Sequence, residues 1–380
     1  MKILAATGTR ADWGLLVPVL KRLRDDSRFD LEIAVTGQHL KLGNSSLNAI
    51  AQDGFEIDHK IPMGLTNDDS EVALTQAMGA CIAGSGAVLA QAKPDLCLVL
   101  GDRYEVLCFV SAALISQVPV AHLCGGDLTY GAFDDSIRHA ITKMSALHFV
   151  TNADAARRIQ QLGEDPSHVI ISGSPGIDRI LAQPIVARDQ FVAEVGLSES
   201  GDFILVSFHP ETLATDKAAQ LSALMKALAV FPEVGLVLTG SNADPGGQAI
   251  DEAFSGLAEM RENAVFHTSL GSRLYFSAMA HSSLMLGNSS SGLFEAPSFR
   301  IPTVNIGDRQ AGRPRARSVI DCAATVDAIS EAIIYARTLD CRNVENPFGC
   351  GRAAEIIVET LAEFDTLAEL NKKRFRDFRV

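Results

Sequence analysis

The side chains best suited to acid–base chemistry follow two apolar runs in the first half of the chain. Asp102 follows the run 96–100, and Asp127 follows the run 119–124. Asp134 begins the segment DDSIRH a few residues later. Carboxylates that lie close together raise one another's pKa, which is one way in which general acids and bases are tuned to act near neutral pH. These positions therefore predict a cluster that transfers protons.

Two of these carboxylates also have a simpler, structural interpretation. Asp102 is followed by Arg103, and the two could form a salt bridge within their loop. Asp134 is followed by Asp135, and one of them could cap the helix expected from Ser136. One aspartate of the pair Asp134 and Asp135 could cap the helix while the other takes part in proton transfer.

Two loops could bring phosphate-binding groups to the ends of predicted strands. Arg10 lies in the loop 8–12 (GTRAD) between the first strand and a helix. Backbone N–H groups at a helix start favour anions, and a guanidinium can bind phosphate through two hydrogen bonds. The alternative is an ordinary turn capped by Asp12. His209 ends another predicted strand, and in a loop made rigid by Pro210 it could reach a phosphate or donate a proton.

The strongest phosphate signal lies in the second half of the chain. The segment 287–292 (GNSSSG) leads from a predicted strand into a helix, and Glu295 follows one turn later. Hydroxyls and free N–H groups at a helix start form a phosphate cradle. Glu295 could then accept hydrogen bonds from the hydroxyls of a ribose, and Arg309 and Arg313 add positive charge nearby. A serine-rich turn can also be a plain linker.

Short apolar runs alternate with stretches of helical period along the whole chain. The strands expected in the first half are Lys2–Thr7, Leu31–Thr36, Asp95–Leu100, Pro119–Cys124, Leu147–Thr151 and Val169–Ser172. Those expected in the second half are Phe203–Phe208, Gly235–Thr239, Val265–His267, Leu284–Leu286 and Thr303–Ile306. Several are nearly continuous in Val, Ile and Leu, as in parallel sheets covered on both faces. The alternation predicts βαβ units and a doubly wound α/β fold.

The turn-rich region between Ser172 and Phe203 predicts a boundary between two domains. We expect Rossmann-like, parallel-sheet domains at residues 1–180 and 181–361, with a C-terminal helix at about 362–380 that packs back on the first. Open α/β sheets bind ligands at the carboxyl ends of their strands. The carboxylates of the first domain and the phosphate-binding residues of the second are therefore expected to line a central cleft.

The composition limits the classes of partner. Of the 380 residues, 47% are hydrophobic and 21% charged, so the chain can bury large cores and is not a disordered protein. Acidic residues outnumber basic ones 46 to 33, giving a net charge of −13, whereas nucleic-acid binders carry the opposite bias. No nucleic-acid partner is expected, and a phosphate-bearing ligand should be small and held by a few arginines.

The apolar runs and cysteines predict a cytoplasmic protein. Residues 1–7 resemble a first strand and lack the regions of a signal peptide. The longest apolar run, Val106–Ile115, is short for a membrane span, so no membrane partner is expected. The seven cysteines are scattered without a CxxC pair, which predicts reduced thiols and no zinc site.

Taken together and in this order, the motifs resemble the hydrolysing UDP-N-acetylglucosamine 2-epimerase family, which begins the synthesis of sialic-acid-type sugars. The similarity covers nearly the whole chain. The motifs that carry it are GTRAD at 8–12, TGQHL at 36–40, GDRYE at 101–105, DDSIRHAITKMS at 134–145, FHPET at 208–212, GNSSSGLFEAPSF at 287–299 and GDRQAGR at 307–313.

The resemblance implies a GT-B-like fold and an elimination reaction. The hydrogen on sugar carbon 2 is not beside a carbonyl, so its removal must accompany loss of UDP from carbon 1. Water then adds to the resulting glycal and yields the free 2-epimer. Such a reaction requires an acid, a base and cations for the departing diphosphate. The resemblance implies no metal or redox cofactor and a homodimer or homotetramer.

Matching the motifs residue by residue gives two predicted sets. The catalytic set is Asp102, Asp127, Asp134, Arg138 and His209. The substrate-binding set is Arg10, Asp12, His39, Arg103, Cys124, Ser289, Ser290, Ser291, Gly292, Glu295, Arg309 and Arg313.

The chain departs from the family pattern around its HxxGG segment. Cys124 stands where relatives often carry a glutamate or another polar residue, and Asp127 stands where a glutamate follows the glycines. Tyr130 also stands where a glutamate is common. A thiol is a poorer base than a carboxylate unless its pKa falls. Asp127 could take over the role of Cys124, or the substrate could differ, for instance a UDP-2,4-diacetamido-trideoxyhexose.

Three other functions fit parts of the pattern. A non-hydrolysing 2-epimerase would return the epimerised UDP-sugar, whereas the GDRQ and HxxGG patterns favour the hydrolysing branch. A GT-B glycosyltransferase would release UDP only in the presence of an acceptor. A catalytically impaired UDP-sugar-binding protein is suggested by Cys124.

Overall fold

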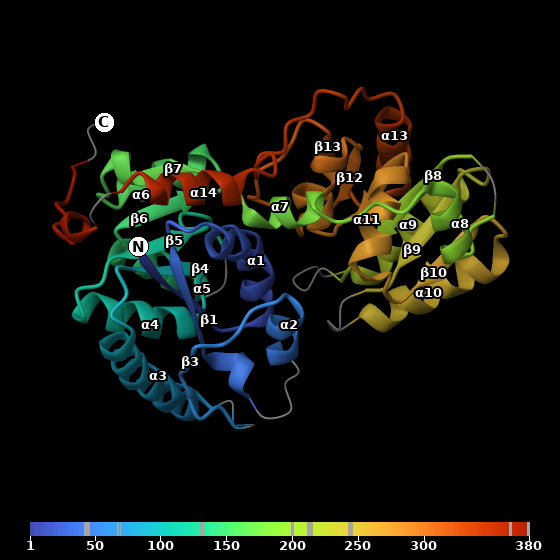
Figure 1. The fold of residues 1–380 in the computed structure, drawn as a ribbon. Helices are drawn as coiled ribbons and strands as arrows, with labels where there is room; N and C mark the ends of the chain where they lie inside the picture. The colour runs from blue at the N-terminus through green and yellow to red at the C-terminus, as the bar shows by residue number, and fades with distance from the viewer. Residues whose placement is uncertain are drawn as a thin grey trace. The chain divides into compact units, whose positions relative to one another are not determined.

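The computed structural model describes residues 1–41, 46–66, 68, 70–129, 133–198, 201–210, 216–241, 246–364 and 367–377 (Figure 1). The chain divides into two compact units, one of residues 1–179 and 348–380 and the other of residues 180–347. Each unit is built on one parallel sheet with helices packed against it. The predicted doubly wound α/β fold is therefore confirmed.

The sheet of the first unit has seven parallel strands in the order β3-β2-β1-β4-β5-β6-β7. Its strands are β1 Lys2–Thr7, β2 Asp30–Val35, β3 His59–Lys60, β4 Leu96–Leu100, β5 Val120–Leu123, β6 Leu147–Val150 and β7 Val169–Ile171. Its helices are α1 Arg10–Asp25, α2 Ser46–Gln52, α3 Glu71–Ala92, α4 Tyr104–Ile115, α5 Asp134–Met144, α6 Ala153–Gln161 and α14 Ala353–Ala362, with 3-10 turns at Gly37–Leu40, Pro166–His168 and Ala368–Asn371. The strand order reverses between β1 and β4, and ligands bind at such a switch point in open α/β sheets.

The sheet of the second unit has six strands in the order β10-β9-β8-β11-β12-β13, with its reversal between β8 and β11. The strands are β8 Phe203–Ser207, β9 Gly235–Thr239, β10 Ala264–His267, β11 Leu284–Gly287, β12 Thr303–Ile306 and β13 Val319–Cys322. The helices are α8 Arg188–Val195, α9 Lys217–Ala229, α10 Gly247–Met260, α11 Gly271–His281, α12 Ser291–Phe294 and α13 Val326–Ala336, with a 3-10 turn at Ala296–Phe299. The connecting helix α7 spans Pro175–Leu181.

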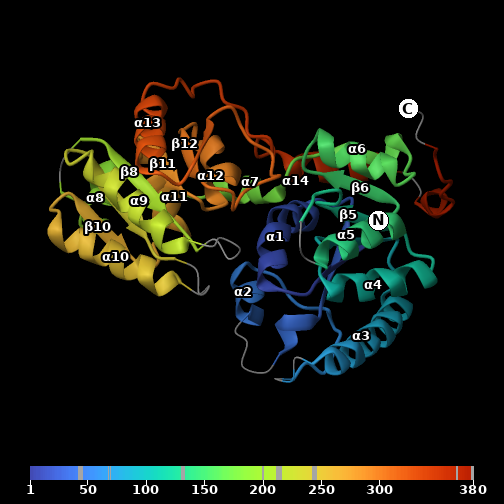
Figure 2. The ribbon, with the colours of Figure 1, turned by 180° about the vertical axis from the view of Figure 1, so that it is seen from behind.

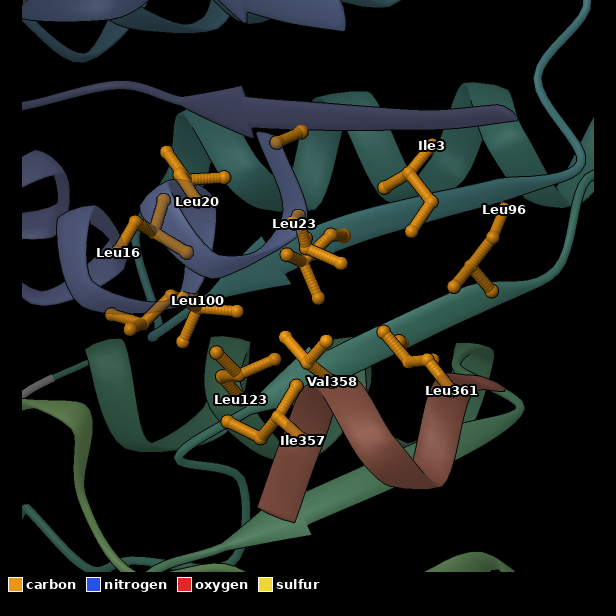
Figure 3. Packing of buried hydrophobic residues seen from close by; sticks show 14 of the residues in the cluster. Ile3, Leu16, Leu20, Leu23, Leu96, Leu100, Leu123, Ile357, Val358 and Leu361 are labelled. Carbon is orange, nitrogen blue, oxygen red and sulfur yellow. The ribbon is translucent and has the colours of Figure 1, made fainter. Parts of the chain in front are cut away.

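The end of the chain returns to the first unit at Phe348, earlier than the predicted segment at about 362–380. The Asp178 carboxylate accepts hydrogen bonds from the first N–H groups of α14, at 3.0 Å from Ala353 and 2.8 Å from Ala354. Figure 3 shows Ile357, Val358 and Leu361 of α14 pointing into the same apolar cluster as the leucines of α1 and β4. The apolar face of α14 therefore belongs to the core of the first unit.

By length and composition, helix α3 could cross a membrane. It is the only helix among the described residues of which this is true. In Figures 1 and 2 it lies at the outer edge of the first unit beside α4, against which it packs. It is therefore the crossover helix between β3 and β4.

Candidate active site

Arg138 ties together two of the predicted catalytic loops in the first unit. Asp102 follows β4 and Asp127 follows β5, and these strands are neighbours in the sheet. The Arg138 guanidinium forms an ion pair with Asp102. It also donates hydrogen bonds of 2.8 Å to the backbone oxygen of Asp127 and to Oγ1 of Thr129. The Arg138 side chain is only 9% exposed, so this network is largely shielded from water.

The adjacent aspartates Asp134 and Asp135 have different environments. Asp135 Oδ1 accepts a 2.7 Å hydrogen bond from the Thr129 backbone N–H, and its Oδ2 lies 3.5 Å from His139 Nε2. Asp134 Oδ1 is buried and has no hydrogen-bond partner among the described residues. Asp135 therefore holds the loop, which leaves the Asp134 carboxylate available for chemistry.

The environment of Asp127 favours a protonated carboxyl group. Burial raises the pKa of Asp127, although a hydrogen bond from Thr151 and the charge of Arg138 act in the opposite direction. Thr151 Oγ1 donates to Asp127 Oδ1 at 2.9 Å. A carboxyl group that keeps its proton closer to neutral pH has the property required of a general acid.

A second group of buried charges lies at the ends of β1 and β4. The Glu105 side chain is completely buried, and its Oε2 lies 3.4 Å from Arg103 Nε. Neither carboxylate oxygen of Glu105 has a hydrogen-bond partner among the described residues. Burial raises the pKa of the nearby Asp12 to about 6, and the charges of Glu105 and Asp102 add to the shift. The Asp12 carboxylate is therefore held in an environment that disfavours its charged form.

The structure places three of the predicted residues after β1 and β2, and it corrects the predicted helix cap. Thr9 caps α1 by accepting a 3.2 Å hydrogen bond from the Asp12 backbone, so Asp12 is not the cap. Arg10 is exposed in the first turn of the helix. His39 is buried, with Nε2 3.1 Å from Thr7 Oγ1, and burial lowers its pKa to about 4. His39 is therefore neutral and supports the loop from inside.

The second unit contains a polar cavity of about 470 Å³ at the carboxyl ends of its central strands. Five predicted site residues line it: His209, Ser289, Ser290, Ser291 and Arg309. The remaining lining comes from Ser207, Thr239, Gly240, Thr268, Ser269, Leu270, Gly271, Ser272 and Tyr275. Hydroxyl groups thus dominate the wall, and Arg309 provides its positive charge.

Asn288 fixes the geometry of this cavity. Its Oδ1 accepts from the His209 backbone N–H and its Nδ2 donates to the His209 backbone oxygen, each at 2.8 Å. The Asn288 backbone oxygen accepts from Arg309 Nη1 at 3.2 Å and from Gln310 Nε2 at 2.8 Å. One asparagine therefore joins the loops after β8, β11 and β12.

Tyr275 adds a buried hydroxyl beside the serines. It is in hydrogen-bond contact with Ser291, Ser207 and Ser289, and burial raises its pKa to about 12. Burial also raises the pKa of Glu295, whose Oε2 has no hydrogen-bond partner within the described part of the chain. A buried acceptor without a donor is what a ligand hydroxyl would satisfy.

A family model described as UDP-N-acetylglucosamine 2-epimerase matches residues 21–362 of the chain. The chain belongs to this epimerase family. It is 37% identical over 328 residues to the GDP/UDP-N,N'-diacetylbacillosamine 2-epimerase (hydrolyzing) of Campylobacter jejuni, covering 84% of each protein. It is 35% identical over 356 residues to the UDP-N,N'-diacetylbacillosamine 2-epimerase (hydrolyzing) of Legionella pneumophila, covering 93% of each.

The fold agrees with solved structures of the same family. A UDP-GlcNAc 2-epimerase from Neisseria meningitidis bound to UDP-GlcNAc matches with a TM-score of 0.79 and 20% identity, over 96% of this chain and all of that chain. A putative UDP-N-acetylglucosamine 2-epimerase from Listeria monocytogenes also has a TM-score of 0.79, at 17% identity, over the whole of this chain and 99% of that chain. The GT-B-like fold implied by the motifs is thereby confirmed.

In this epimerase, Cys124 cannot replace a carboxylate as a base at neutral pH. Burial raises the pKa of its thiol, and the charges of Asp127 and Asp102 raise it further. The Cys124 backbone has φ of 61°, in the left-handed region that few side chains adopt, directly at the end of β5. The residue therefore turns the chain towards Asp127 with a neutral side chain.

Three predicted substrate-binding residues do not line the cavity of the second unit: Gly292, Glu295 and Arg313. A Cβ on Gly292 would lie 2.5 Å from Thr303 Cγ2, so this glycine serves close packing of α12 on β12. Burial together with the Arg309 charge lowers the pKa of Arg313. Tyr130 and the last two residues of the FHPET motif lie outside the described residues.

Sequence reasoning missed Glu105, Tyr275 and the hydroxyl-bearing loop at 268–272 as functional candidates. Glu105 is the last residue of the GDRYE motif and could have been found there. Tyr275 and the loop carry no motif of their own. They reach the cavity because β10, β9, β8 and β11 are neighbours in the sheet.

Proposed function

We propose that this protein is a hydrolysing UDP-sugar 2-epimerase that releases UDP and a free 2-epimeric N-acetyl sugar. The observation that carries this proposal is the pairing, in one chain, of a shielded carboxylate cluster around Arg138 with a hydroxyl-lined cavity beside Arg309. The substrate is UDP-N-acetylglucosamine or a UDP-2,4-diacetamido-trideoxyhexose. The names of the Campylobacter and Legionella relatives favour the diacetamido sugar.

The first unit would carry out the proton transfers. Asp134, with its unpartnered oxygen, is the proposed base for the hydrogen on carbon 2. As the C2–H electron pair forms the C1=C2 double bond, the C1–O bond breaks and its electrons leave with UDP. Water then adds its hydroxyl to carbon 1 and loses its other proton to solvent, while carbon 2 receives a proton on the opposite face. Asp127 is the proposed donor of that proton, because burial raises its pKa, which favours the role of an acid. The base and the acid afterwards exchange protons with solvent and regain their starting states.

Arg138 and Asp102 would position these groups. Arg138 pairs with Asp102 and holds the backbone of Asp127, so it links both loops to the helix that carries Asp134. Asp102 also remains a candidate for direct acid–base work, as its motif implies. A charge-assisted pair in a shielded site keeps its geometry better than an exposed pair.

The second unit would bind UDP. Ser289, Ser290 and Arg309 are proposed diphosphate ligands, and His209, which lines the same cavity, is proposed to assist them. Glu295 would accept hydrogen bonds from the ribose. Arg10 of the first unit, which is exposed at the start of α1, is a further proposed ligand of the diphosphate. The elimination needs only acid, base and cationic groups, so we propose no metal or redox cofactor.

The cellular setting also remains a proposal. We propose a cytoplasmic enzyme that assembles as a homodimer or homotetramer, with no nucleic-acid or membrane partner. The acidic composition, a net charge of −13, supports the exclusion of nucleic acid.

The decisive test is product analysis in D₂O without an added acceptor. Each of the two UDP-sugars is incubated with the protein, and proton NMR follows free UDP and the released sugar. We expect free UDP in equal amount to a free 2-epimer that carries one deuterium at carbon 2. Return of an epimerised UDP-sugar would instead support the non-hydrolysing alternative. UDP release that depends on an acceptor would support a glycosyltransferase, and tight UDP binding with no turnover would support a binding protein.

A further inference from the structure

The last part of the chain described by the structure is a basic segment, residues 371–377, which we call the C-terminal strap. Four of its seven residues are Lys or Arg. It continues from the last 3-10 turn, where Leu367 and Leu370 pack into the core of the first unit. Figures 1 and 2 both show this red end of the chain beside helix α6. The reaction proposed above uses none of its residues.

Lys373 connects the strap to the buried side chain of Glu164. Its Nζ lies 2.7 Å from Glu164 Oε2, and the Glu164 side chain is only 2% exposed. Glu164 also pairs with Lys143 at 2.7 Å and accepts a 3.1 Å hydrogen bond from His148 Nε2. Burial acts to raise the pKa of Glu164, but these three hydrogen bonds lower it to about 2. Glu164 is therefore a carboxylate at neutral pH, and it is a fixed anchor for the strap.

Lys373 also holds the C-terminal end of helix α5. Its Nζ donates hydrogen bonds to the backbone oxygens of Lys143 and Ser145, at 2.8 and 2.5 Å. Carbonyl groups at the end of a helix lack partners within the helix, and a cation beside them interacts favourably with the helix dipole. One ammonium group thus caps the helix that begins at Asp134 and carries Arg138.

The rest of the strap fits the loop that follows α6. The Arg376 backbone N–H donates to the Gly163 oxygen at 3.0 Å, and the Arg376 guanidinium pairs with Asp165 at 2.5 Å. The Phe375 ring lies so close to Gly163 that a Cβ at this position would clash with it. Contacts on the C-terminal side of Lys373 therefore hold the strap in place as well.

The held end of α5 is connected to the loop that carries Asp102. Thr142, in the last turn of α5, has its Oγ1 3.2 Å from His122 Nδ1, and His122 Nε2 lies 2.8 Å from the oxygen of Gly101. A carbonyl oxygen only accepts, so Nε2 donates and Nδ1 accepts from the hydroxyl. Burial lowers the pKa of His122 to about 3, which keeps the ring neutral. A Cβ on Gly125 would lie 2.8 Å from Thr142 Oγ1, so this glycine leaves room for the contact.

We propose that Lys373 is a positioning residue for the reaction: it fixes the end of α5 and, through this helix, the carboxylates of Asp134 and Asp102. The proposal rests on the proposed function and deepens it, because it adds a residue at the opposite end of α5 from Asp134. UDP is proposed to bind to the second unit, so loss of the strap contact should lower kcat and leave KM unchanged. Misplacement of a reacting group by about 1 Å can lower a rate about a hundredfold.

The first experiment compares the kinetics of UDP release by the wild type and by Lys373→Met. Methionine removes the ammonium group, while Glu164 keeps its bonds to Lys143 and His148. We expect kcat to fall about tenfold and KM to change less than about twofold. The control is Arg374→Met, at the exposed neighbouring residue of the strap, which should retain the wild-type kcat and KM.

Three outcomes of this experiment would overturn the proposal. One is an unchanged kcat in Lys373→Met, and another is a rise in KM at constant kcat. The third is a Lys373→Met chain that thermal unfolding shows to be denatured at the assay temperature, because the strap would then serve overall stability.

The second experiment follows α5 itself and requires no turnover. Hydrogen exchange measured by mass spectrometry reports local opening of a helix. In Lys373→Met we expect exchange in residues 138–145 to be at least about tenfold faster, with unchanged exchange in β8 of the second unit. Arg374→Met should exchange like the wild type. Unchanged exchange in α5 would overturn the proposal. A wild type that releases no UDP would instead contradict the proposed function, and the exchange would still show whether the strap anchors α5.

The third experiment tests the connection from α5 to the Asp102 loop with a double variant. Thr142→Val removes the hydrogen bond to His122 in a side chain of similar shape and does not touch the strap. If Lys373 acts through the end of α5, the effects of Thr142→Val and Lys373→Met on kcat should not multiply. We expect the double variant to be about as slow as the slower single variant. Effects that multiply would mean that the two residues act independently, which would overturn the role of α5 in the proposal.

Discussion

The two units of this epimerase hold their candidate site residues by different means. In the first unit, charged side chains are buried with few partners: Glu105 is completely buried, and the pKa values of Asp12 and Asp127 are raised by burial. In the second unit, hydroxyl groups line the cavity, and one amide, Asn288, holds the surrounding loops through backbone atoms. Proton transfer benefits from desolvated carboxylates, whereas binding a phosphate group needs donors in fixed positions.

This contrast predicts that substitutions in the first unit mainly lower kcat, while those in the second mainly weaken UDP binding. In the first unit the charged side chains are shielded from water and interact with one another. Removing one of them therefore leaves another buried charge without its partner. The second spreads its interactions over many neutral donors, so removing one has a smaller effect.

The largest effect should come from Arg138→Met. This change leaves Asp102 without its cation and frees the Asp127 and Thr129 loop. Because it disturbs both proposed proton-transfer groups, we expect kcat to fall by at least about a thousandfold, with the affinity for UDP nearly unchanged. The measurements are UDP release and calorimetric UDP titration. Arg157→Met, at an exposed ion pair on α6, is the control and should retain wild-type kcat; equal losses in both variants would contradict the role of Arg138.

The adjacent aspartates offer the next test. Asp134→Asn removes the proposed base without removing a hydrogen bond that holds the loop, so kcat should fall by roughly a hundredfold or more while the melting temperature stays the same. Asp135→Asn weakens the contact to the Thr129 N–H and should lower both kcat and the melting temperature by smaller amounts. Steady-state kinetics and thermal unfolding of both variants check this. If Asp135→Asn loses more activity than Asp134→Asn, the roles are reversed.

In the second unit, Asn288→Ala should act on binding. It removes two 2.8 Å hydrogen bonds to the His209 backbone, each with a net value of about 1 kcal/mol. We expect UDP to bind about tenfold more weakly, with kcat at saturating substrate changed less than threefold. Asn263→Ala is a matched control, because Asn263 also bonds to a loop, at 3.1 Å to the Pro232 oxygen, on the amino side of the sheet. A fall in kcat without loss of UDP affinity would remove the distinction between the units.

Much of the fold could be predicted because the central strands are continuous in apolar residues. All five residues of β4 are buried, and their sequence LCLVL has the composition of a strand covered on both faces. The short edge strand β3 has only two residues, and β13 (VIDC) includes a charged residue, so neither has a clear apolar run. The return of α14 to the first unit depends on contacts with Asp178 and α1, far away in the chain.

Site residues could be predicted where a motif lies at the end of a strand. They could not be predicted where contacts between distant parts of the chain determine which residues belong to the site. Asp102, Asp127, Ser289 and Arg309 could be named from their motifs. The motif match selected Asp134, but the residues alone left open which of Asp134 and Asp135 has a structural role, because that depends on the position of the Thr129 backbone. Tyr275 comes from a helix with no motif and joins the serines only through the order of the strands.

The smallest predicted effect concerns pH and would sharpen the account of the first unit. The folded-state pKa of Asp12 is raised from 3.8 to about 6, so the folded protein binds more protons than the unfolded chain between these values. Stability contributed by this site therefore falls as pH rises through that window, by up to about 3 kcal/mol. Asp12→Asn should raise the melting temperature by a few degrees at pH 7.5 and leave it nearly unchanged at pH 3.5. Thermal unfolding of both proteins across this range checks the prediction. A stabilisation that is equal at both pH values would mean that packing, and not the buried charge, distinguishes this site from the hydroxyl-lined cavity of the second unit.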